Sequence, residues 1–236
     1  MSATMNDALK GVGVIFDLDG TLVDTAGDLA ASMNHALAIE GHKPLPVAAV
    51  RHLVGHGAKA MIAKGLALSG VDRPTDEEME HHRRNFLDHY RAHIADHSRP
   101  FDGALAAIED LSAAGAVLAI CTNKHEEPAR QLIGTLRLDR YFPVIVGGDT
   151  ASAPKPDPAP VRLCLERLGV ERAIFIGDSD TDIAAAANTG LTCLLHTKGY
   201  GPLTKVDTVF ACFDDYSLMF ALTLKALAAA GSGCGP

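Results

Sequence analysis

The sequence contains no long apolar run and no surplus of positive charge. No stretch approaches the roughly 18 consecutive apolar residues that a membrane-spanning helix needs, so we expect no membrane partner. Lys and Arg number 21 against 29 Asp and Glu, which gives a net charge of −8. Nucleic acids and anionic membranes both require clustered positive charge, so we expect neither as a partner. The segment Met1–Lys10 lacks a basic region followed by an apolar run, so we expect no secretory signal.

Cysteine is scarce and follows no recognisable spacing. Its five positions, none of them in a Cys-x-x-Cys pair, are Cys121, Cys164, Cys193, Cys212 and Cys234. An odd number without such spacing indicates reduced thiols and a cytoplasmic protein. The first apolar run is also not followed by Gly-x-Gly-x-x-Gly, which argues against a dinucleotide-binding domain.

The composition is nevertheless that of a folded protein. Of the 236 residues, 47% are hydrophobic and 21% are charged, which is enough apolar material for a sizeable core. The length exceeds one typical domain of roughly 150 residues but falls short of two. We therefore expect either a single large α/β domain or a core that carries an inserted subdomain.

Short apolar runs alternate with helical patterns along most of the chain. The runs that we predict as strands are Val12–Phe16, Val117–Cys121, Val144–Val146, Ala173–Ile176 and Leu191–Leu195. Between two of them, Leu105, Ile108 and Leu111 have the spacing of one helical face. Continuously apolar strands that alternate with helices are typical of a parallel sheet covered on both faces. The predicted fold class is therefore α/β, an open doubly wound parallel sheet.

The alternation is interrupted between residues 26 and 97, where the patterns are only helical. One predicted helix extends from Asp76 to about His97 and begins with a capping box formed by Thr75 and Glu78. We therefore expect residues 26–97 to form an inserted helical cap domain. Residues 1–25 and 98–236 would then form the α/β core, with the linkers near Thr25 and near Ser98.

Two aspartates follow the first predicted strand immediately. Asp17 and Asp19 are two residues apart in an extended segment, so their side chains project to the same side. Two neighbouring carboxylates repel each other unless a cation lies between them or one of them keeps a proton. Gly20 then allows a sharp turn. Taken alone, the pair is equally compatible with two solvated surface aspartates.

Four further polar residues follow the ends of other predicted strands. Thr122 comes after the second strand, Lys155 lies beyond the third, and Asp178 and Asp182 follow the fourth. Ligands of open parallel sheets bind in the crevice at the carboxyl ends of the strands. We therefore expect a hydroxyl, an ammonium and several carboxylates to meet at one place.

In order and spacing, these motifs resemble those of the haloacid dehalogenase-like (HAD) phosphatase superfamily. The matching segments are Asp17-Leu-Asp-Gly-Thr21, Thr122, Lys155 in Lys-Pro-Asp-Pro, and Gly177-Asp-Ser-Asp-Thr-Asp182. The inserted helices are similar to the α-helical cap of that superfamily. Three further segments look most like those of phosphoglycolate phosphatases, namely Leu53-Val-Gly-His-Gly-Ala58, Cys121-Thr-Asn-Lys124 and Lys155-Pro-Asp-Pro-Ala-Pro160.

The resemblance implies a Mg²⁺-dependent phosphomonoesterase with a covalent intermediate. Asp17 would be the nucleophile that forms an aspartyl-phosphate. Mg²⁺ would be bound by Asp17, by the backbone carbonyl of Asp19 and by Asp178, with Asp182 orienting these ligands. Asp19 would be the general acid, which requires it to hold a proton near neutral pH.

The resemblance also assigns groups that bind the phosphoryl oxygens. Lys155 would neutralise their charge and Thr122 would donate a hydrogen bond. The backbone N–H groups of Leu18 and Asn123 are candidate further donors.

A glycine-rich loop in the predicted cap is a candidate site for the rest of the substrate. Gly55, His56 and Gly57 precede a predicted helix, so their free N–H groups could bind an anion such as the carboxylate of phosphoglycolate. Arg51 lies nearby in the sequence and adds positive charge. An ordinary glycine-rich connection remains the alternative.

These observations predict an enzyme for a small phosphorylated metabolite, with 2-phosphoglycolate as the first candidate, that acts as a monomer or homodimer. A related pyrophosphatase, a sugar-phosphate phosphatase or a phosphomutase would share the same motifs. A response-regulator receiver also combines a phosphorylated aspartate with Mg²⁺, Thr and Lys on a parallel sheet, but it is a signalling switch. The predicted cap and a candidate acid at Asp19 favour an enzyme.

Overall fold

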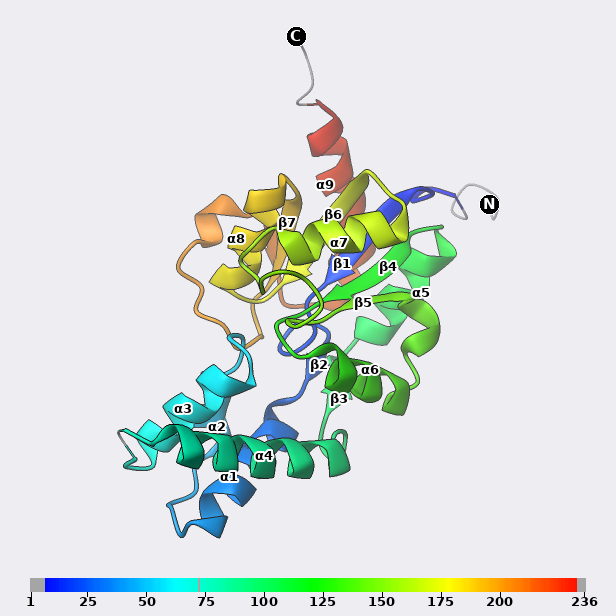
Figure 1. Ribbon diagram of the computed structural model, residues 1–236. Coiled ribbons are helices and arrows are strands. Elements are labelled where there is room, and N and C mark those ends of the chain that lie inside the picture. The colour runs from blue at the N-terminus through cyan, green and yellow to red at the C-terminus, as the bar shows by residue number, and fades with distance from the viewer. Residues whose placement is uncertain (1–6, 72, 233–236) are drawn as a thin grey trace.

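A six-stranded parallel sheet forms the centre of the molecule (Figure 1). The computed structural model describes residues 7–71 and 73–232. The sheet has the strand order β5-β4-β1-β6-β7-β8, and every neighbouring pair is parallel. Its strands are β1 (Val12–Phe16), β4 (Val117–Cys121), β5 (Val144–Val146), β6 (Arg172–Gly177), β7 (Thr192–His196) and β8 (Ala211–Phe213). Five of them were predicted to within one residue at each end, whereas β8 was not.

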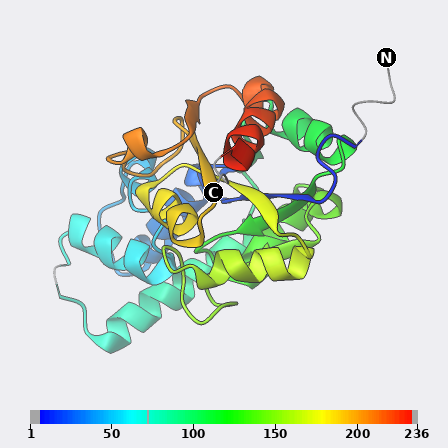
Figure 2. The ribbon, with the colours of Figure 1, turned by 90° about the horizontal axis from the view of Figure 1, so that it is seen from above.

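Helices cover both faces of this sheet (Figure 2). Val12, Val14 and Phe16 of β1 pack on one face, whereas Ile15 packs on the other. The first face is covered by α5 (Ala104–Ala113), α6 (Glu126–Thr135) and α9 (Met219–Ser232), and the second by α7 (Ala159–Leu168) and α8 (Asp180–Thr189). The prediction of a doubly wound α/β fold is thus confirmed. Short 3₁₀ helices η1 (Asp139–Tyr141), η2 (Val206–Thr208) and η3 (Tyr216–Leu218) lie in the connections.

One detail of the predicted helix faces is wrong. Ile108 and Leu111 of α5 are buried, but Leu105 is 42% exposed. In the first turn of α5, Ala104 is fully buried and faces the core, whereas Leu105 lies on the exposed side of the helix.

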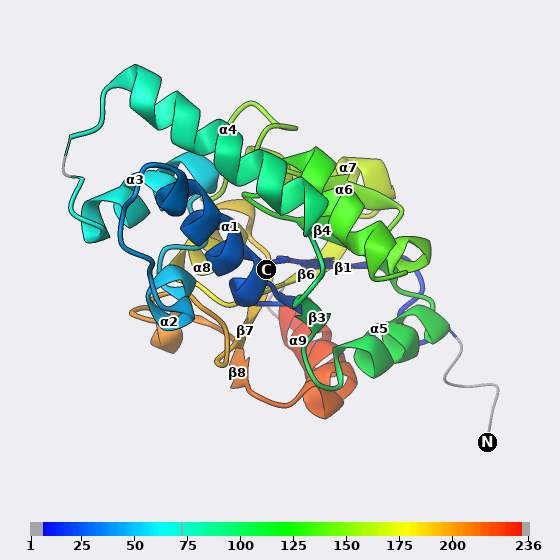
Figure 3. The ribbon, with the colours of Figure 1, turned by 90° about the horizontal axis from the view of Figure 1, so that it is seen from below.

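Four helices lie together beyond the carboxyl ends of the strands, and Figure 3 shows them from below. They are α1 (Ala26–Ile39), α2 (Val47–Arg51), α3 (Ala58–Leu68) and α4 (Asp76–Ala92). The predicted capping box is present, because the Thr75 side chain accepts a hydrogen bond from the Glu78 N–H and the Glu78 carboxylate accepts one from the Thr75 N–H. None of the helices in the described part of the chain is long and apolar enough to cross a membrane.

Helix α4 ends at Ala92, earlier than the predicted end near His97. The reason lies outside the helix: the carboxylate of Asp28 in α1 accepts hydrogen bonds from the N–H groups of His97 and Ser98 and from the Ser98 hydroxyl. Asp28 is only 1% exposed, so these bonds are protected from water. The buried carboxylate thus holds the returning chain in an irregular conformation against α1.

The two connections between the helical insert and the sheet are paired with each other. Strand β2 (Val23–Asp24) forms an antiparallel ribbon with β3 (Arg99–Pro100), in which Asp24 faces Arg99. All four insert helices lie between these two strands in the sequence. We therefore propose the division suggested by the sequence, with residues 26–97 as the cap and residues 1–25 and 98–236 as the core.

Candidate active site

The polar residues that follow the strands do meet at the carboxyl ends of β1, β4 and β6. Asp17 follows β1, Thr122 follows β4 and Asp178 follows β6, and all three are at most 8% exposed. Parallel neighbours place these three strand ends at the same edge of the sheet. The loop after β5 brings Lys155, which is 4% exposed, to the same place.

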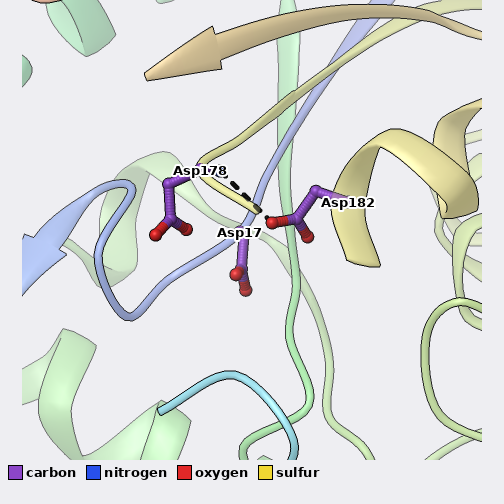
Figure 4. Close-up of side chains that lie close together, drawn as sticks. All are labelled: Asp17, Asp178 and Asp182. Carbon is purple, nitrogen blue, oxygen red and sulfur yellow. Dashed lines mark hydrogen bonds between the residues drawn. The ribbon is translucent and has the colours of Figure 1, made fainter. Parts of the chain in front are cut away.

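Three carboxylates form the centre of the site (Figure 4). Asp17, Asp178 and Asp182 each offer an oxygen, and these atoms all lie within 4.8 Å of one another. Among the residues that the structure describes, this is the one group of three or more acidic, His or Cys side chains with such spacing. The three side chains come from two segments that lie more than 150 residues apart in the sequence, and the sheet brings them together.

Burial and the neighbouring negative charges make two of these carboxylates, Asp17 and Asp178, hard to ionise. Burial raises the pKa of Asp17 from 3.8 to about 6, with Lys155 acting against it and Asp182 adding to it. Burial and the neighbouring Asp182 and Asp17 raise the pKa of Asp178 to about 8. The cluster as it stands therefore holds more negative charge than its surroundings compensate.

One ammonium serves two of these carboxylates. Lys155 Nζ donates a hydrogen bond to Asp182 Oδ1 at 2.6 Å and lies 3.0 Å from Asp17 Oδ1. The Asp17 oxygen is nevertheless buried without a hydrogen bond of suitable geometry. Although burial disfavours a charged amine, the two aspartates raise the pKa of Lys155 above its usual range.

The donor set fits a hard divalent cation. It consists of oxygen atoms alone, the buried Asp17 Oδ1 makes no hydrogen bond and has only the ion pair with Lys155, and this single ammonium opposes three carboxylates. Mg²⁺ and similar ions bind such oxygen ligands and would supply the missing positive charge.

Asp182 is arranged differently from the other two. Its Oδ2 accepts hydrogen bonds from the N–H groups of Asp178 and Ser179 and from the Ser179 hydroxyl. The Ser179 hydroxyl oxygen in turn accepts from the Asp182 N–H, so Ser179 and Asp182 form a capping box at the start of α8. Asp182 Oδ1 accepts from Lys155. Ser179 is thus the N-cap of this helix. With both oxygens already engaged, Asp182 is suited to orienting Lys155 and the backbone of Asp178.

Asp19 lies apart from the carboxylate cluster and has its own partners. Lys124 Nζ donates to its two oxygens at 2.7 and 2.9 Å, and the Thr25 hydroxyl donates to Oδ1 at 2.7 Å. Burial opposes the charge of Lys124, but Asp19 and Tyr90 together raise the pKa of this lysine above its usual range. Neither Lys124 nor Thr25 was predicted as a site residue. Lys124 could have been found, because it lies only two residues beyond Thr122, after the same strand end.

A cavity extends from Asp17 and Asp19 toward the cap helices. Its core side is polar and its far side is mostly apolar. The lining residues are Asp17, Asp19, Leu29, Val54, Gly55, Gly57, Ala58, Met61, Phe86, Leu87, Tyr90, Thr122, Asn123, Lys124, His125 and Pro128. Tyr90 is buried with an unpartnered hydroxyl, and Lys124 Nζ lies 4.8 Å from the centre of its ring.

The predicted cap loop contacts the core beside this cavity. Asn123 Nδ2 donates to the carbonyl oxygens of Gly55 and Lys155, both at 3.0 Å, so one side chain joins the cap loop to the loop after β5. Gly55 and Gly57 line the cavity, and Gly57 precedes α3 with a φ of 82° that favours glycine. His56 is absent from the lining of the cavity as the structure describes it. The anion-binding role predicted for this loop stays a prediction.

Arg51 lies near the hinge, the β2–β3 ribbon that connects the cap to the core, and not in the cavity lining. Its guanidinium pairs with Asp24 Oδ2 at 3.1 Å and lies 5.1 Å from the centre of the Tyr200 ring. The backbone N–H of Leu18 bonds the carboxylate of Asp17 and lowers its pKa, against the larger effect of burial. The roles that we predict for Leu18 and Arg51 toward a substrate likewise stay predictions.

The loop after β7 supports Asp178, which the sequence patterns did not predict. Tyr200 N–H donates to Asp178 Oδ2 at 2.6 Å, and the Thr21 hydroxyl donates to Oδ1 at 2.8 Å. A Cβ on Gly199 would lie 2.3 Å from Asp178, and one on Gly201 would lie 2.2 Å from the Ser179 Cβ. Only glycines allow this loop to approach the carboxylate so closely.

Comparison with known proteins places this chain among hydrolases with the same motifs. A family model described as haloacid dehalogenase-like hydrolase matches residues 14–196. A phosphoglycolate phosphatase of Agrobacterium fabrum is 39% identical over 221 residues, which are 92% of this chain and 94% of the relative. A phosphoglycolate phosphatase of Caulobacter vibrioides is 42% identical over 201 residues, which are 84% of each chain.

Solved structures show the same architecture. A predicted phosphoglycolate phosphatase from Haemophilus somnus superposes with a TM-score of 0.84 at 28% identity, covering 89% of this chain and 96% of the other. A second structure, a putative phosphoglycolate phosphatase from Lactobacillus delbrueckii, gives a TM-score of 0.81 at 25% identity over 91% of this chain and 99% of the other. The resemblance therefore includes the helical insert as well as the sheet.

Proposed function

The chain belongs to the haloacid dehalogenase-like hydrolase family and is a phosphatase, and from this premise we propose that it hydrolyses 2-phosphoglycolate to glycolate and phosphate with Mg²⁺ as cofactor. The names of the relatives support this substrate. The family membership sets aside the receiver-type signalling switch. Four of the cysteines, Cys121, Cys164, Cys193 and Cys212, are free, which supports the cytoplasmic location that we propose.

The observation that carries the proposal is the position of Lys124. On the side of the cavity away from Asp17, the cap contributes mainly apolar side chains such as Met61, Phe86 and Leu87. Lys124 brings a buried ammonium to this region, with its side chain 8% exposed. A short substrate with a phosphate at one end and a carboxylate at the other matches this distribution of charge. A sugar would instead leave several hydroxyl groups against apolar surface.

In the proposed reaction, the carboxylate of Asp17 attacks phosphorus and forms an aspartyl-phosphate while the bond to the glycolate oxygen breaks. Mg²⁺ bound by Asp17, Asp178 and the carbonyl oxygen of Asp19 would reduce the repulsion between the nucleophile and the phosphate dianion. Lys155, the Thr122 hydroxyl and the N–H groups of Leu18 and Asn123 would stabilise charge on the phosphoryl oxygens.

Asp19 would give its proton to the departing glycolate oxygen and later accept one from the water that hydrolyses the aspartyl-phosphate. Thr25 and Lys124 hold its carboxylate in the lining of the cavity. A substrate carboxylate bound by Lys124 would share this ammonium with Asp19, which would link recognition of the substrate to the acid.

A screen of phosphate release tests the substrate. The purified protein is assayed against some dozens of phosphorylated metabolites, including pyrophosphate and sugar phosphates, with and without Mg²⁺. We expect the highest kcat/KM with 2-phosphoglycolate and no turnover without a divalent cation. A higher kcat/KM with pyrophosphate or with a sugar phosphate, or conversion of a sugar phosphate to its isomer, would overturn the proposal in favour of that related activity.

A pair of lysine variants tests the role of Lys124. Lys124→Met removes the charge and keeps the length of the side chain, and Lys64→Met makes the same change at an exposed position of α3. We expect Lys124→Met to lower kcat/KM for 2-phosphoglycolate at least about 100-fold, the cost of an unpaired buried carboxylate, and to affect p-nitrophenyl phosphate much less. Equal losses for both substrates would contradict recognition of a carboxylate by Lys124.

A further inference from the structure

Tyr200 lies in the loop between β7 and η2 and is 4% exposed. Its main chain faces the carboxylate cluster, because its N–H donates to Asp178 Oδ2. Its ring packs against the turn after β1, where a Cβ on Gly20 would lie 2.9 Å from two ring atoms. A single residue of the core thus contacts both the cluster and the turn that carries Asp19.

The hydroxyl of Tyr200 reaches the hinge of the cap. It accepts hydrogen bonds from the N–H of Thr25 at 2.6 Å and from the N–H of Ala26 at 3.0 Å, and it donates to Asp24 Oδ1. Ala26 is the first residue of α1, and Thr25, its N-cap, makes no side-chain capping bond. The N–H groups at a helix start need an acceptor from elsewhere. A tyrosine of the core supplies it to the first helix of the cap.

The hydroxyl of Thr25 is free of the capping role and binds the proposed acid. Thr25 Oγ1 donates to Asp19 Oδ1 at 2.7 Å, while Tyr200 holds the N–H of the same residue. Thr25 is fully buried, so its backbone and side chain have fixed partners on two sides. The contacts run without a gap from Asp178 through Tyr200 and Thr25 to Asp19.

We propose that Tyr200 is a positioning residue that places Asp19 for proton transfer to the leaving group, acting through Thr25, and that it fixes the start of the cap relative to the carboxylate cluster. The inference rests on the proposed role of Asp19 as general acid. Removal of the Tyr200 hydroxyl leaves the Thr25 N–H without an acceptor and the Ala26 N–H with only the 3.3 Å bond to Asp24 Oδ1, and it lets Thr25 shift. A shift of about 1 Å in a reacting group can cost about 100-fold in rate.

The consequence depends on how much the leaving group needs a proton. Glycolate leaves as a basic alkoxide unless it is protonated, whereas p-nitrophenolate is a stable anion that leaves without help. The test is therefore the single-turnover rate at which each alcohol is released under excess enzyme. This rate reports the attack of Asp17 and excludes the later hydrolysis of the aspartyl-phosphate, which is common to both substrates.

Tyr200→Phe keeps the ring and the N–H bond to Asp178 but removes the hydroxyl. We expect it to slow glycolate release at least about tenfold and p-nitrophenol release less than about twofold. The Mg²⁺ concentration for half-maximal rate should stay within about twofold, because the contact with Asp178 is a main-chain bond. A loss of equal size for both substrates overturns the proposal.

Tyr216→Phe is the matched control. Tyr216 is 2% exposed, and its hydroxyl donates to the carbonyl oxygen of Thr21 in the same turn, but it makes no hydrogen bond to Thr25. Tyr216→Phe therefore also removes a buried tyrosine hydroxyl that is hydrogen-bonded beside the same site. We expect it to change the two release rates by the same factor. A leaving-group dependence as large as that of Tyr200→Phe would count against the specific path through Thr25.

Thr25→Val tests the contact between Thr25 and Asp19. It also tests the proposal if Tyr200→Phe does not fold. It removes the bond to Asp19 and keeps the N–H that Tyr200 holds, and we expect the same selective loss for glycolate. The double variant should lose no more than about twofold beyond the larger single loss, because both changes act on one path. Additive losses overturn the proposal.

Asp19→Asn in the same assay separates this inference from the proposed function. If Asp19→Asn slows glycolate release selectively and Tyr200→Phe does not, the inference about Tyr200 fails alone. If Asp19→Asn shows no selectivity for the leaving group, the acid role fails and the inference fails with it.

Discussion

The two sides of the cavity differ sharply in chemistry. On the core side, Asp17 lines the cavity and belongs to a group of buried charges, in which Lys155 lies 3.0 Å from Asp17 and an oxygen of Asp178 lies within 4.8 Å of it. On the cap side, Phe86 and Leu87 belong to a mainly apolar lining. Lys124 and Asp19 form an ion pair at the boundary between the charged core side and the apolar cap side.

This difference indicates a division of labour. Charges interact more strongly where apolar surface excludes water, because the effective dielectric constant falls. The apolar cap can thus strengthen the electrostatics of the core without contributing a charge to the reaction. Changes on the core side should abolish turnover, whereas changes toward the cap should alter selectivity or affinity, and four experiments test this contrast.

Asp17→Asn should have the largest effect, because it removes the proposed nucleophile while leaving a side chain of the same size. We expect the rate of phosphate release to fall by about 10⁴-fold or more. Asp110→Asn, the same change at an exposed position of α5, should leave the rate unchanged. A variant that keeps a tenth of the normal rate would exclude Asp17 as the nucleophile.

Asp19→Asn removes the proposed acid at the boundary of the two surfaces. Turnover of 2-phosphoglycolate should fall about 10²- to 10⁴-fold, the usual contribution of general acid catalysis. Binding of Mg²⁺, followed by calorimetry, should be largely retained, because Asp19 is expected to offer its carbonyl and not its carboxylate. Full turnover by this variant would contradict the role of Asp19.

The carboxylate cluster should make the stability of the protein depend on pH and on Mg²⁺. The pKa values of Asp17 and Asp178, about 6 and about 8, lie above the 3.8 of an unfolded aspartate. Between about pH 4 and pH 8, the folded protein therefore binds more protons than the unfolded protein. Without a divalent cation, the free energy of unfolding should therefore fall as the pH rises from about 4 to about 8. Saturating Mg²⁺ should raise Tm more at pH 8 than at pH 5, by about 2–4 °C for each kcal/mol of stabilisation.

Asp178→Asn is the control for that measurement. It removes one of the perturbed carboxylates, so the fall in stability with pH should become shallower and the effect of Mg²⁺ on Tm should largely vanish. An equal rise in Tm with Mg²⁺ at both pH values in the unmodified protein would show that the cluster does not bind the cation.

Arg51→Ala should have the smallest effect. The ion pair of Arg51 with Asp24 is partly exposed, and such pairs contribute at most about 1 kcal/mol. We therefore expect KM to change less than about fivefold, and equally for 2-phosphoglycolate and p-nitrophenyl phosphate. A selective rise in KM for 2-phosphoglycolate, in Arg51→Ala or in His56→Ala, would instead support the glycine-rich cap loop as the carboxylate site.

The parts of the fold that could be predicted from the sequence are those with a local pattern. The strands β1, β4 and β6 are continuous apolar runs that end in polar residues. Strand β8, which has three residues, was not predicted, although it lies in the apolar segment 209–213. The end of α4 was misplaced because it depends on Asp28, which is distant in the sequence.

The same distinction applies to the site. Asp17, Lys155, Asp178 and Asp182 could be predicted because each follows a strand end. Thr25 and Tyr200 could not, because their bonds to the site involve a main-chain N–H or a hydroxyl that meets a partner many residues away. No periodicity or spacing in the sequence marks such contacts.

The paired ribbon at the hinge has a practical consequence for redesign. Asp24 and Arg99 are direct partners in β2 and β3, so their Cα atoms lie about 4.5–5.5 Å apart. A two-residue turn such as Asn-Gly could join them and replace the whole helical insert with a hairpin. The resulting capless protein would keep Asp17, Lys155, Asp178 and Asp182 on an intact sheet, an open scaffold onto which the insert of another family member could be grafted.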